Sequence, residues 1–140
     1  MRIKAVIDTN VLVASLITNT NDAPTVKVIN YIFDNTIIPL YSEEIMTEYI
    51  EVLSRSKFAI KQHNIGKLIN IIKEKGIKVK PAKIDIELLD EDDLPFYEVV
   101  MEKRSEGSML VTGNIKHYPE KVFIVTPKEM VDLIEQNNRS

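Results

Sequence analysis

Short apolar runs and stretches of helical spacing follow one another along this chain. The runs at residues 4–7, 37–41, 77–79, 108–112 and 122–125 have the length and composition of buried strands. In the segments between them, apolar residues recur at intervals of three and four, the spacing of an amphipathic helix. Strands that alternate with helices predict a central, mostly parallel β-sheet with α-helices on both faces, an α/β fold.

Individual residues refine these elements. Pro39 predicts that the strand 37–41 lies at the edge of the sheet or ends there. Ser42 can act as an N-cap, Gly76 can end a helix, and the segment 126–129 (Thr-Pro-Lys-Glu) has the pattern of a capping box. The apolar helix faces are expected to contain Val28, Ile29, Ile32 and Phe33; Ile45, Tyr49, Val52 and Leu53; Ile65, Leu68, Ile69 and Ile72; and Phe96, Val99 and Val100.

Composition limits the domain count and the kind of metal site. A chain of 140 residues has the usual size of one domain, so we expect a single domain over residues 1–140. Apolar residues make up 44% of it, which is enough for a real core. There are no cysteines to form disulfides or thiolate sites, and only two histidines, which argues against a histidine-built zinc site. A bound metal would be a hard cation held by oxygen.

The charge balance and the N-terminus bear on partners and location. With 18 basic and 21 acidic residues the net charge is −3, which argues against coating nucleic acid through a global positive field but allows a local basic rim. The apolar run after Lys4 is interrupted by Asp8, Thr9 and Asn10, which a signal peptide would not tolerate. No apolar stretch has the length of a membrane span. We therefore expect a cytoplasmic protein with no membrane partner.

The polar residues with most chemical interest lie where strands end. In a parallel sheet, ligands bind outside the carboxyl ends of the strands, where the strand order reverses. Asp8 ends the first predicted strand, and Asn114 follows the fourth. Asp93 stands at the start of a helix, and Glu48 lies at the margin of an apolar helix face. These side chains are candidates for one site.

Three carboxylates gathered at one point would need a counter-charge. Two carboxylates about 5 Å apart repel by roughly 3 kcal/mol at an effective dielectric near 20. Three such pairs cost on the order of 10 kcal/mol, comparable to the whole stability of a small domain. Mg²⁺ or Mn²⁺ would neutralise the cluster through oxygen ligands, and such an ion can activate a water and stabilise charge on a phosphate under attack. This is the chemistry of metal-dependent phosphodiester hydrolysis.

Each candidate residue also has an ordinary structural interpretation. The segment from Asp8 to Asn10 can be a turn and a helix N-cap, and Asp93 can be another cap. Glu48 alone is typical of a solvated helix edge, and the acidic stretch 85–93 is typical of a solvated loop. His117, like its neighbour Lys116, is typical of an ordinary surface residue. Spacing alone leaves these alternatives open.

Four sequence blocks, in order, resemble those of PIN domains and cover essentially the whole chain. The blocks are Ile7-Asp8-Thr9-Asn10-Val11-Leu12; Ser42-Glu43-Glu44-Ile45-Met46-Thr47-Glu48-Tyr49 with Val52, Leu53 and Arg55; Asp90-Glu91-Asp92-Asp93-Leu94-Pro95-Phe96; and Leu110-Val111-Thr112-Gly113-Asn114 followed by Ile124-Val125-Thr126-Pro127-Lys128-Glu129. The opening triplet is not specific by itself, but the ordered set is. The resemblance implies a single PIN-like domain.

This resemblance also implies an activity and a set of roles. Asp8, Glu48 and Asp93 would be the catalytic, metal-binding carboxylates, with Asp90 as an accessory acid. The enzyme would be a Mg²⁺- or Mn²⁺-dependent ribonuclease acting on single-stranded RNA, the toxin component of a toxin–antitoxin pair. Its partner would be an antitoxin protein, and the chain would form a homodimer. The apolar face from Ile65 to Ile72 is a candidate dimer surface. The supporting polar residues would be Thr9, Asn10, Ser42 and Thr112.

One position departs from the family pattern, because many PIN domains have an aspartate where this chain has Asn114. Asparagine still offers a carbonyl oxygen but no charge, which predicts weaker metal binding and disfavours a second ion. Basic residues near the motifs are candidates for contacting the RNA backbone, with Tyr118 as a ring that could stack on a base. These candidates are Arg55, Lys57, Lys103, Arg104, Lys116 and Tyr118.

Other functions remain to be weighed. Asn114 and the modest basic content also suit a PIN-like module that binds RNA or a protein without cutting it. A haloacid-dehalogenase-type phosphatase would need an aspartate at position 10, where this chain has Asn10, and paired acids after Thr112 rather than before it. A response-regulator receiver would need a Lys-Pro pair after a late strand, but Val125 is followed by Thr126 and Pro127. The last two are remote.

Overall fold

The computed structural model describes residues 1–88 and 90–138, and its five strands form one parallel sheet. The order across the sheet is β3-β2-β1-β4-β5, and every neighbouring pair is parallel. The sequence prediction of an α/β fold with a parallel sheet is thus confirmed. The strands are β1 (Ile3–Ile7), β2 (Ile37–Tyr41), β3 (Ile77–Lys78), β4 (Met109–Val111) and β5 (Ile124–Val125).

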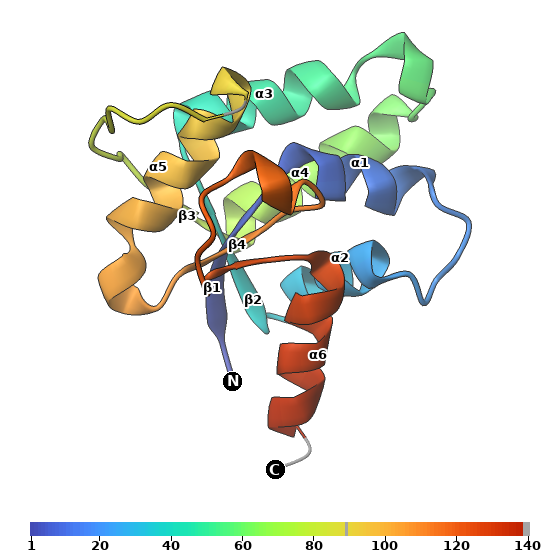
Figure 1. Cartoon of the computed structure of the whole chain (residues 1–140). Coiled ribbons are helices and arrows are strands. Elements are labelled where there is room, and N and C mark those ends of the chain that lie inside the picture. The colour runs from blue at the N-terminus through green and yellow to red at the C-terminus, as the bar shows by residue number, and fades with distance from the viewer. Residues whose placement is uncertain (89, 139–140) are drawn as a thin grey trace.

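Helices cover both faces of this sheet, as the alternating pattern predicts (Figure 1). Helix α5 packs on one face, against β1, β2 and β4, and helices α2 and α4 contact β2 from the other. Helix α1 packs on α2 and α3, and α6 packs on α2. The helices are α1 (Thr9–Ile17), α2 (Pro24–Phe33), α3 (Glu43–Leu53), α4 (Gln62–Lys75), α5 (Leu94–Glu102) and α6 (Pro127–Asn138).

The core contains most of the residues expected on the apolar helix faces, but Phe33 of α2 is 37% exposed, so the expectation that it lies on a buried face is wrong. The packing of α4 bears on assembly. Ile65, Leu68, Ile69 and Ile72 of α4 are all buried within this chain, at most 6% exposed. Their face packs on the core, so the expectation that it is a dimer surface is wrong. Among the described residues, no helix is long and apolar enough to cross a membrane.

Pro39 lies in a strand that has neighbours on both sides, so the edge-strand prediction is wrong. Strand β2 runs between β1 and β3. Alternate residues of a strand face opposite neighbours, and Tyr41 accepts from the Val79 N–H on the β3 side at 2.7 Å. Pro39 therefore faces the same side, where pairing with β3 begins only at Leu40. No ladder donor is lost, because the missing N–H falls beyond the end of the short neighbouring strand.

Several local signals act as the sequence indicates. Ser42 caps α3, since its Oγ accepts from the Ile45 N–H at 3.2 Å. The capping box before α6 is formed in both directions, between the Thr126 N–H and Glu129 at 2.9 Å and between the Glu129 N–H and Thr126 at 3.1 Å. Gly76 ends α4 with an extended backbone, and a Cβ there would lie 2.5 Å from the Pro39 carbonyl oxygen. Close approach to β2 thus requires glycine at this position.

The strand order reverses at one point of the sheet, between β1 and β4. From β1 the chain moves outward to β2 and β3, then returns to β4 on the other side of β1 and continues to β5. The order therefore reverses between β1 and β4, whose carboxyl ends lie side by side: the Asp8 N–H donates to the Val111 carbonyl at 2.9 Å. This is the position where parallel α/β sheets bind ligands.

Candidate metal centre

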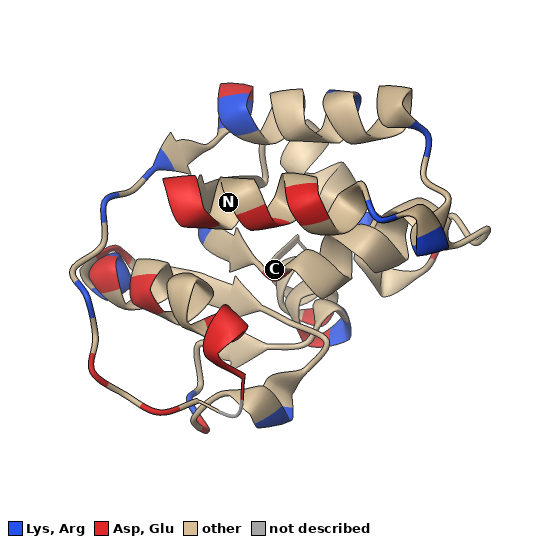
Figure 2. Cartoon of the chain, turned by 90° about the horizontal axis from the view of Figure 1, so that it is seen from above, with Lys and Arg blue, Asp and Glu red and all other residues tan. Residues whose placement is uncertain are grey.

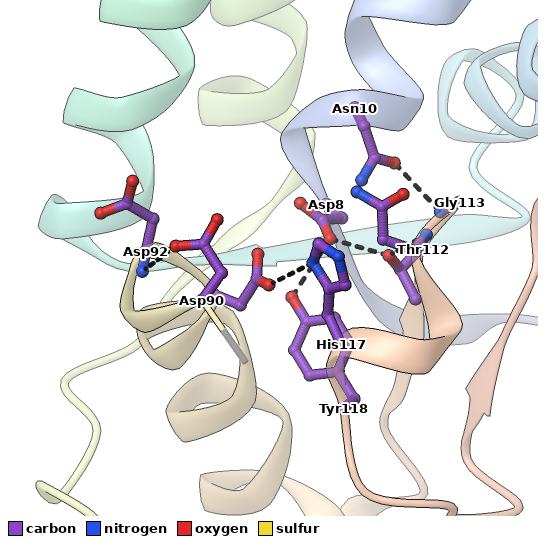
Figure 3. A network of polar contacts seen from close by, with 10 residues as sticks. Asp8, Asn10, Asp90, Asp92, Thr112, Gly113, His117 and Tyr118 are labelled. Atoms are coloured by element: carbon purple, nitrogen blue, oxygen red, sulfur yellow. Dashed lines mark hydrogen bonds and ion pairs between the residues drawn. The ribbon is translucent and has the colours of Figure 1, made fainter. Parts of the chain in front are cut away.

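Asp8 occupies the reversal point and is held by residues from the far end of the chain. It directly follows β1 and is 3% exposed. Its Oδ2 accepts from Thr112 Oγ1 at 2.8 Å and from Tyr118 Oη at 3.1 Å. Figure 3 shows both contacts converging on the carboxylate. The end of β1 is also fixed by Tyr49 of α3, whose hydroxyl donates to the Ile7 carbonyl.

The carboxylates of Asp8 and Asp93 do not serve as helix caps. Each stands at the N-cap position of its helix, Asp8 for α1 and Asp93 for α5, yet neither side chain makes a capping hydrogen bond. Ser42, at the equivalent position of α3, does cap. The ordinary interpretation of Asp8 and Asp93 as caps is therefore wrong: both carboxyl groups are directed elsewhere, toward one edge of the sheet.

Glu48 approaches from α3, the helix that follows β2. Its Oε2 accepts from Thr9 Oγ1 at 2.7 Å, and Thr9 directly follows Asp8 in the chain. The half-buried position of Glu48 agrees with its predicted place at the margin of the apolar face. Thr9 itself is buried, so the glutamate carboxylate is anchored at the start of α1.

Asp93 approaches from the segment before α5 and has a histidine partner. It ends the short 3-10 helix η2 (Glu91–Asp93), and its Oδ2 lies 3.0 Å from His117 Nδ1. Ligand atoms of Asp90, Asp93 and His117 all lie within 4.8 Å of one another. Asp90 also accepts from the Asp92 N–H at 2.9 Å, which holds the turn in place (Figure 3). The expectation that His117 is an ordinary surface residue is wrong.

The electrostatics of the three carboxylates indicate a site that favours positive charge. Burial raises the pKa of Asp8 above its ordinary value, although hydrogen bonds from Thr112 and Tyr118 work against the shift. Burial also raises the pKa of Glu48, and the charges of Asp8 and Asp93 raise it further. The pKa of Asp93 rises to about 6, through burial first and the charge of Asp8 second. The charge of Asp8 thus disfavours the ionisation of both Glu48 and Asp93.

The supporting residues fix the loop that follows β4. Asn10 Oδ1 accepts from the Gly113 N–H at 3.0 Å, and Thr112 Oγ1 accepts from the Asn114 N–H at 3.0 Å. A Cβ at position 113 would lie 3.2 Å from Asn10 Oδ1, so glycine allows this close approach. Asn114 is exposed at the rim beside these contacts. The ends of β1 and β4 are thus tied together by side chain as well as backbone.

Two of the predicted RNA-binding residues lie away from the site. Asp93 is at the N-terminal end of α5, whereas Lys103 follows its C-terminal end and pairs with Glu106 at 3.1 Å. Arg104 donates to the Ser108 carbonyl and lies 4.2 Å over the Phe123 ring. Because α5 runs from one edge of the sheet to the other, the expectation that these two residues flank the site is wrong.

Of the other predicted RNA-binding residues, Lys116 is exposed near the candidate centre, whereas the others have contacts or burial that count against the role. Arg55 pairs with Glu51 at 3.6 Å and lines a groove that is otherwise strongly acidic, and Lys57 lies 5.1 Å over the Phe58 ring. Tyr118 is 6% exposed, so its ring is not available to stack on a base. Lys116 remains exposed beside His117. Viewed from above, acidic residues run along α3 and the segment before α5 (Figure 2).

The donor set suits a hard divalent cation. Carboxylates from the end of β1, from α3 and from η2 face one edge of the sheet, and a cation would offset the burial and the repulsion that raise the pKa values of Glu48 and Asp93. Asp90, Asp93 and His117 lie close enough together to share such an ion. The charge of Asp8 acts on both Asp93 and Glu48, so the carboxylates of Asp8 and Glu48 could contribute to the same centre. A cation in this position could stabilise negative charge on a phosphate group. The fold and site therefore define a parallel α/β domain with an acidic cation-binding centre at its topological reversal.

Comparison with known families gives this class a name. A sequence model of the PIN domain matches residues 4–116, and the chain belongs to the PIN domain family. PIN domains are in general metal-dependent nucleases. The resemblance noted in the sequence is thus confirmed, and the phosphatase and receiver alternatives are set aside. A comparison with curated proteins found no match.

Proposed function

We propose that this chain is a divalent-metal-dependent endoribonuclease that cuts single-stranded RNA and acts as the toxin of a toxin–antitoxin pair. The observation that supports the proposal most is the electrostatic coupling of Asp8 with Glu48 and Asp93, three acids from separate segments, beside the group of possible ligands Asp90, Asp93 and His117. Neither Asp8 nor Asp93 caps its helix, and the charge of Asp8 raises the pKa values of both Glu48 and Asp93. A structural role gives no reason for this crowding.

The proposed division of roles follows from the contacts. Asp8, Glu48 and Asp93 would hold Mg²⁺ or Mn²⁺, which would supply stabilisation of the phosphate charge and a reactive water. Thr9 orients Glu48, and Thr112 orients Asp8. Lys116, which is exposed beside His117, would contact an RNA phosphate.

Asn114 favours a second candidate function, a PIN-like module that binds RNA or a protein without cutting. Asn114 stands exposed at the rim, where an aspartate would add a fourth carboxylate. Without that charge the centre attracts cations less strongly. RNA binding that persists with no cleavage in any divalent ion would support this candidate.

Cleavage of a labelled single-stranded RNA distinguishes the two candidates. The wild type would be incubated in Mn²⁺, in Mg²⁺ and in chelator, beside Asp8→Ala and Asp93→Ala. Asp132→Asn is the matched control, because Asp132 is an exposed aspartate of α6 paired with Lys128. We expect metal-dependent cleavage by the wild type and the control, and none by the other two variants. Equal cleavage by folded Asp8→Ala and Asp93→Ala would rule out the proposed centre.

The toxin assignment has its own test. A neighbouring gene for a small DNA-binding protein would be the expected antitoxin. Induced expression of the chain alone should arrest growth, Asp8→Ala should not, and co-expression of the neighbour should restore growth. Growth unaffected by a wild-type protein that cleaves RNA in vitro would remove the toxin role and leave the nuclease.

A further inference from the structure

Two consecutive residues, His117 and Tyr118, reach two different carboxylates of the metal centre. Tyr118 Oη donates to Asp8 Oδ2 at 3.1 Å, and His117 Nδ1 lies 3.0 Å from Asp93 Oδ2. Asp8 follows β1, whereas Asp93 belongs to η2 before α5. Figure 3 shows His117 and Tyr118 below Asp8, with a dashed line from the Tyr118 hydroxyl toward the Asp8 carboxylate. One dipeptide therefore spans two segments that lie 85 positions apart in the printed sequence, from Asp8 to Asp93.

The tyrosine contact fixes the orientation of the Asp8 carboxylate. Thr112 donates to the same oxygen at 2.8 Å, so two hydroxyl groups converge on Oδ2. A carboxylate oxygen has two lone-pair sites, and both are filled here by protein donors. The Tyr118 ring is buried and stacks on Tyr97 of α5, with centroids 6.4 Å apart and planes inclined by 25°. The donor is thus held rigidly by packing.

The histidine contact fixes Asp93 in the same way from the other side. The Asp93 carboxylate makes no capping bond to a backbone N–H of α5 and contacts His117 Nδ1 instead. Ring stacking ties the loop to α5, because Tyr97 is one turn beyond Asp93. The two oriented carboxylates are therefore braced by a single segment.

The local sequence explains the backbone conformation of the segment that carries His117 and Tyr118. Residues Ile115–His117 form the 3-10 helix η4, closed by the His117 N–H donating to the Asn114 carbonyl at 2.9 Å. Pro119 follows Tyr118 and disfavours helical backbone at that residue. Tyr118 is accordingly extended, with φ −118° and ψ 159°. The helical turn ends at His117, and the change of backbone conformation sends the two side chains to different acids.

We infer that His117 and Tyr118 are positioning residues that together set the relative placement of Asp8 and Asp93 for cation binding. The inference rests on the proposed function, since it assigns these residues to the same metal centre. It replaces the base-stacking role of Tyr118 with a role inside the protein. Outer hydrogen-bond partners of metal-binding carboxylates commonly govern metal affinity, and their loss costs about 10- to 100-fold.

Titration of the full-length protein with Mn²⁺ by calorimetry, without RNA, tests this inference. Tyr118→Phe removes the hydroxyl and keeps the ring; Tyr97→Phe is the matched control, because it removes a hydroxyl from the same buried ring pair without touching Asp8. His117→Ala removes the second contact, and His117→Asn restores a donor near the Nδ1 position. His63→Ala, an exposed histidine of α4, is its control.

We expect Tyr118→Phe and His117→Ala to bind Mn²⁺ about 10-fold more weakly or worse. His117→Asn should recover part of the affinity, and both controls should match the wild type. Melting temperatures in chelator should stay close to the wild-type value, which a merely structural role would not allow. In RNA cleavage, kcat should fall at a fixed Mn²⁺ concentration while KM for RNA is unchanged, because Tyr118 is buried.

The possible failures are distinguishable. A wild type that binds no Mn²⁺ overturns the proposed function, and this inference with it. A wild type that binds Mn²⁺, with Tyr118→Phe and His117→Ala binding equally well, overturns the inference and leaves the proposed function standing. Weaker binding that Tyr97→Phe reproduces would assign the effect to ring packing and would also overturn it.

Discussion

Glu106, where the strands begin, and the three candidate acids, where the strands end, are neutralised in different ways. At the amino edge, Glu106 pairs with Lys4 and Lys103, and these partners lower its pKa. At the carboxyl edge, Asp8, Glu48 and Asp93 are buried or half-buried, and each has a raised pKa. The first edge balances charge with lysines on the surface. The second gathers charge that an external cation would balance.

The largest expected effect comes from breaking the carboxyl edge. Asp93→Asn removes a proposed cation ligand while keeping its size, and we expect RNA cleavage to fall about 1,000-fold, since metal stabilisation of a transition state is worth several kcal/mol. Glu106→Gln at the amino edge should cleave at the wild-type rate with a slightly lower melting temperature. Initial rates in Mn²⁺ measure both. Similar losses of cleavage rate in the two variants would show that the acids at the two edges do not differ in function.

The pH dependence of stability sharpens the comparison. Because the folded pKa of Asp93 is raised to about 6, its contribution to stability is full below the ordinary value of 3.8 and is lost as pH rises to about 6. The loss is at most about 3 kcal/mol, at 1.36 kcal/mol per pKa unit, and solvent screening reduces it. Urea unfolding in chelator at pH 5 and 7.5 measures the part of this change that falls above pH 5, which is about half of it.

Asp93→Asn is the internal control for that measurement, because it removes the titrating group and keeps the rest of the protein. The difference in unfolding free energy between pH 5 and 7.5 should shrink in the variant. A difference of the same size in both proteins would show that Asp93 is not among the crowded acids.

Glu98 is a buried acid with a structural role, in contrast to the candidate metal ligands. Glu98 of α5 is 2% exposed, and its Oε2 accepts from the Ile84 N–H at 2.9 Å, which ties the segment after β3 to the helix. Glu98→Ala leaves that N–H without its partner, and we expect a loss of about 1–3 kcal/mol in unfolding free energy. The stabilisation by Mn²⁺ should be unchanged. A lost Mn²⁺ response would make Glu98 part of the centre.

The smallest expected effect comes from adding a charge at the rim. Asn114→Asp adds a carboxylate at an exposed position, where electrostatic effects are modest. We expect Mn²⁺ to bind a few-fold more tightly, on the order of 1 kcal/mol or less. Calorimetric titration beside the wild type checks this. Unchanged or weaker binding would place residue 114 outside the reach of the cation.

The elements and the acids were predictable from sequence, and their partners were not. Strand and helix positions follow from local spacing, so all five strands were anticipated to within a few residues. Proline is tolerated in the interior strand β2 because pairing with β3 begins only at Leu40. Pro39 alone does not reveal where the neighbouring strand starts. Asp8, Glu48 and Asp93 lie in recognisable blocks. His117 looked ordinary because its role depends on Asp93, which is distant in sequence.

The basic residues show the same limit. Lys103 and Arg104 are close to Asp93 in the sequence, but the nine residues of α5 carry them to the opposite edge of the sheet. The Tyr118 ring is buried against Tyr97, a contact between distant segments that has no local sequence signal. The one remaining clue was the His-Tyr-Pro sequence, since a proline restricts the residue before it.

Thermal unfolding at pH 7.5, with Mn²⁺ and with chelator, tests the central claim most directly, because it needs no RNA substrate. If the carboxyl-edge acids hold a cation, Mn²⁺ at about 100 times its Kd should stabilise the wild type by about 2.7 kcal/mol, or roughly 8 °C. Asp8→Asn should show almost no shift. Equal melting temperatures with and without Mn²⁺ in the wild type, or the same rise in Asp8→Asn, would contradict the assignment of a cation centre to this edge of the sheet.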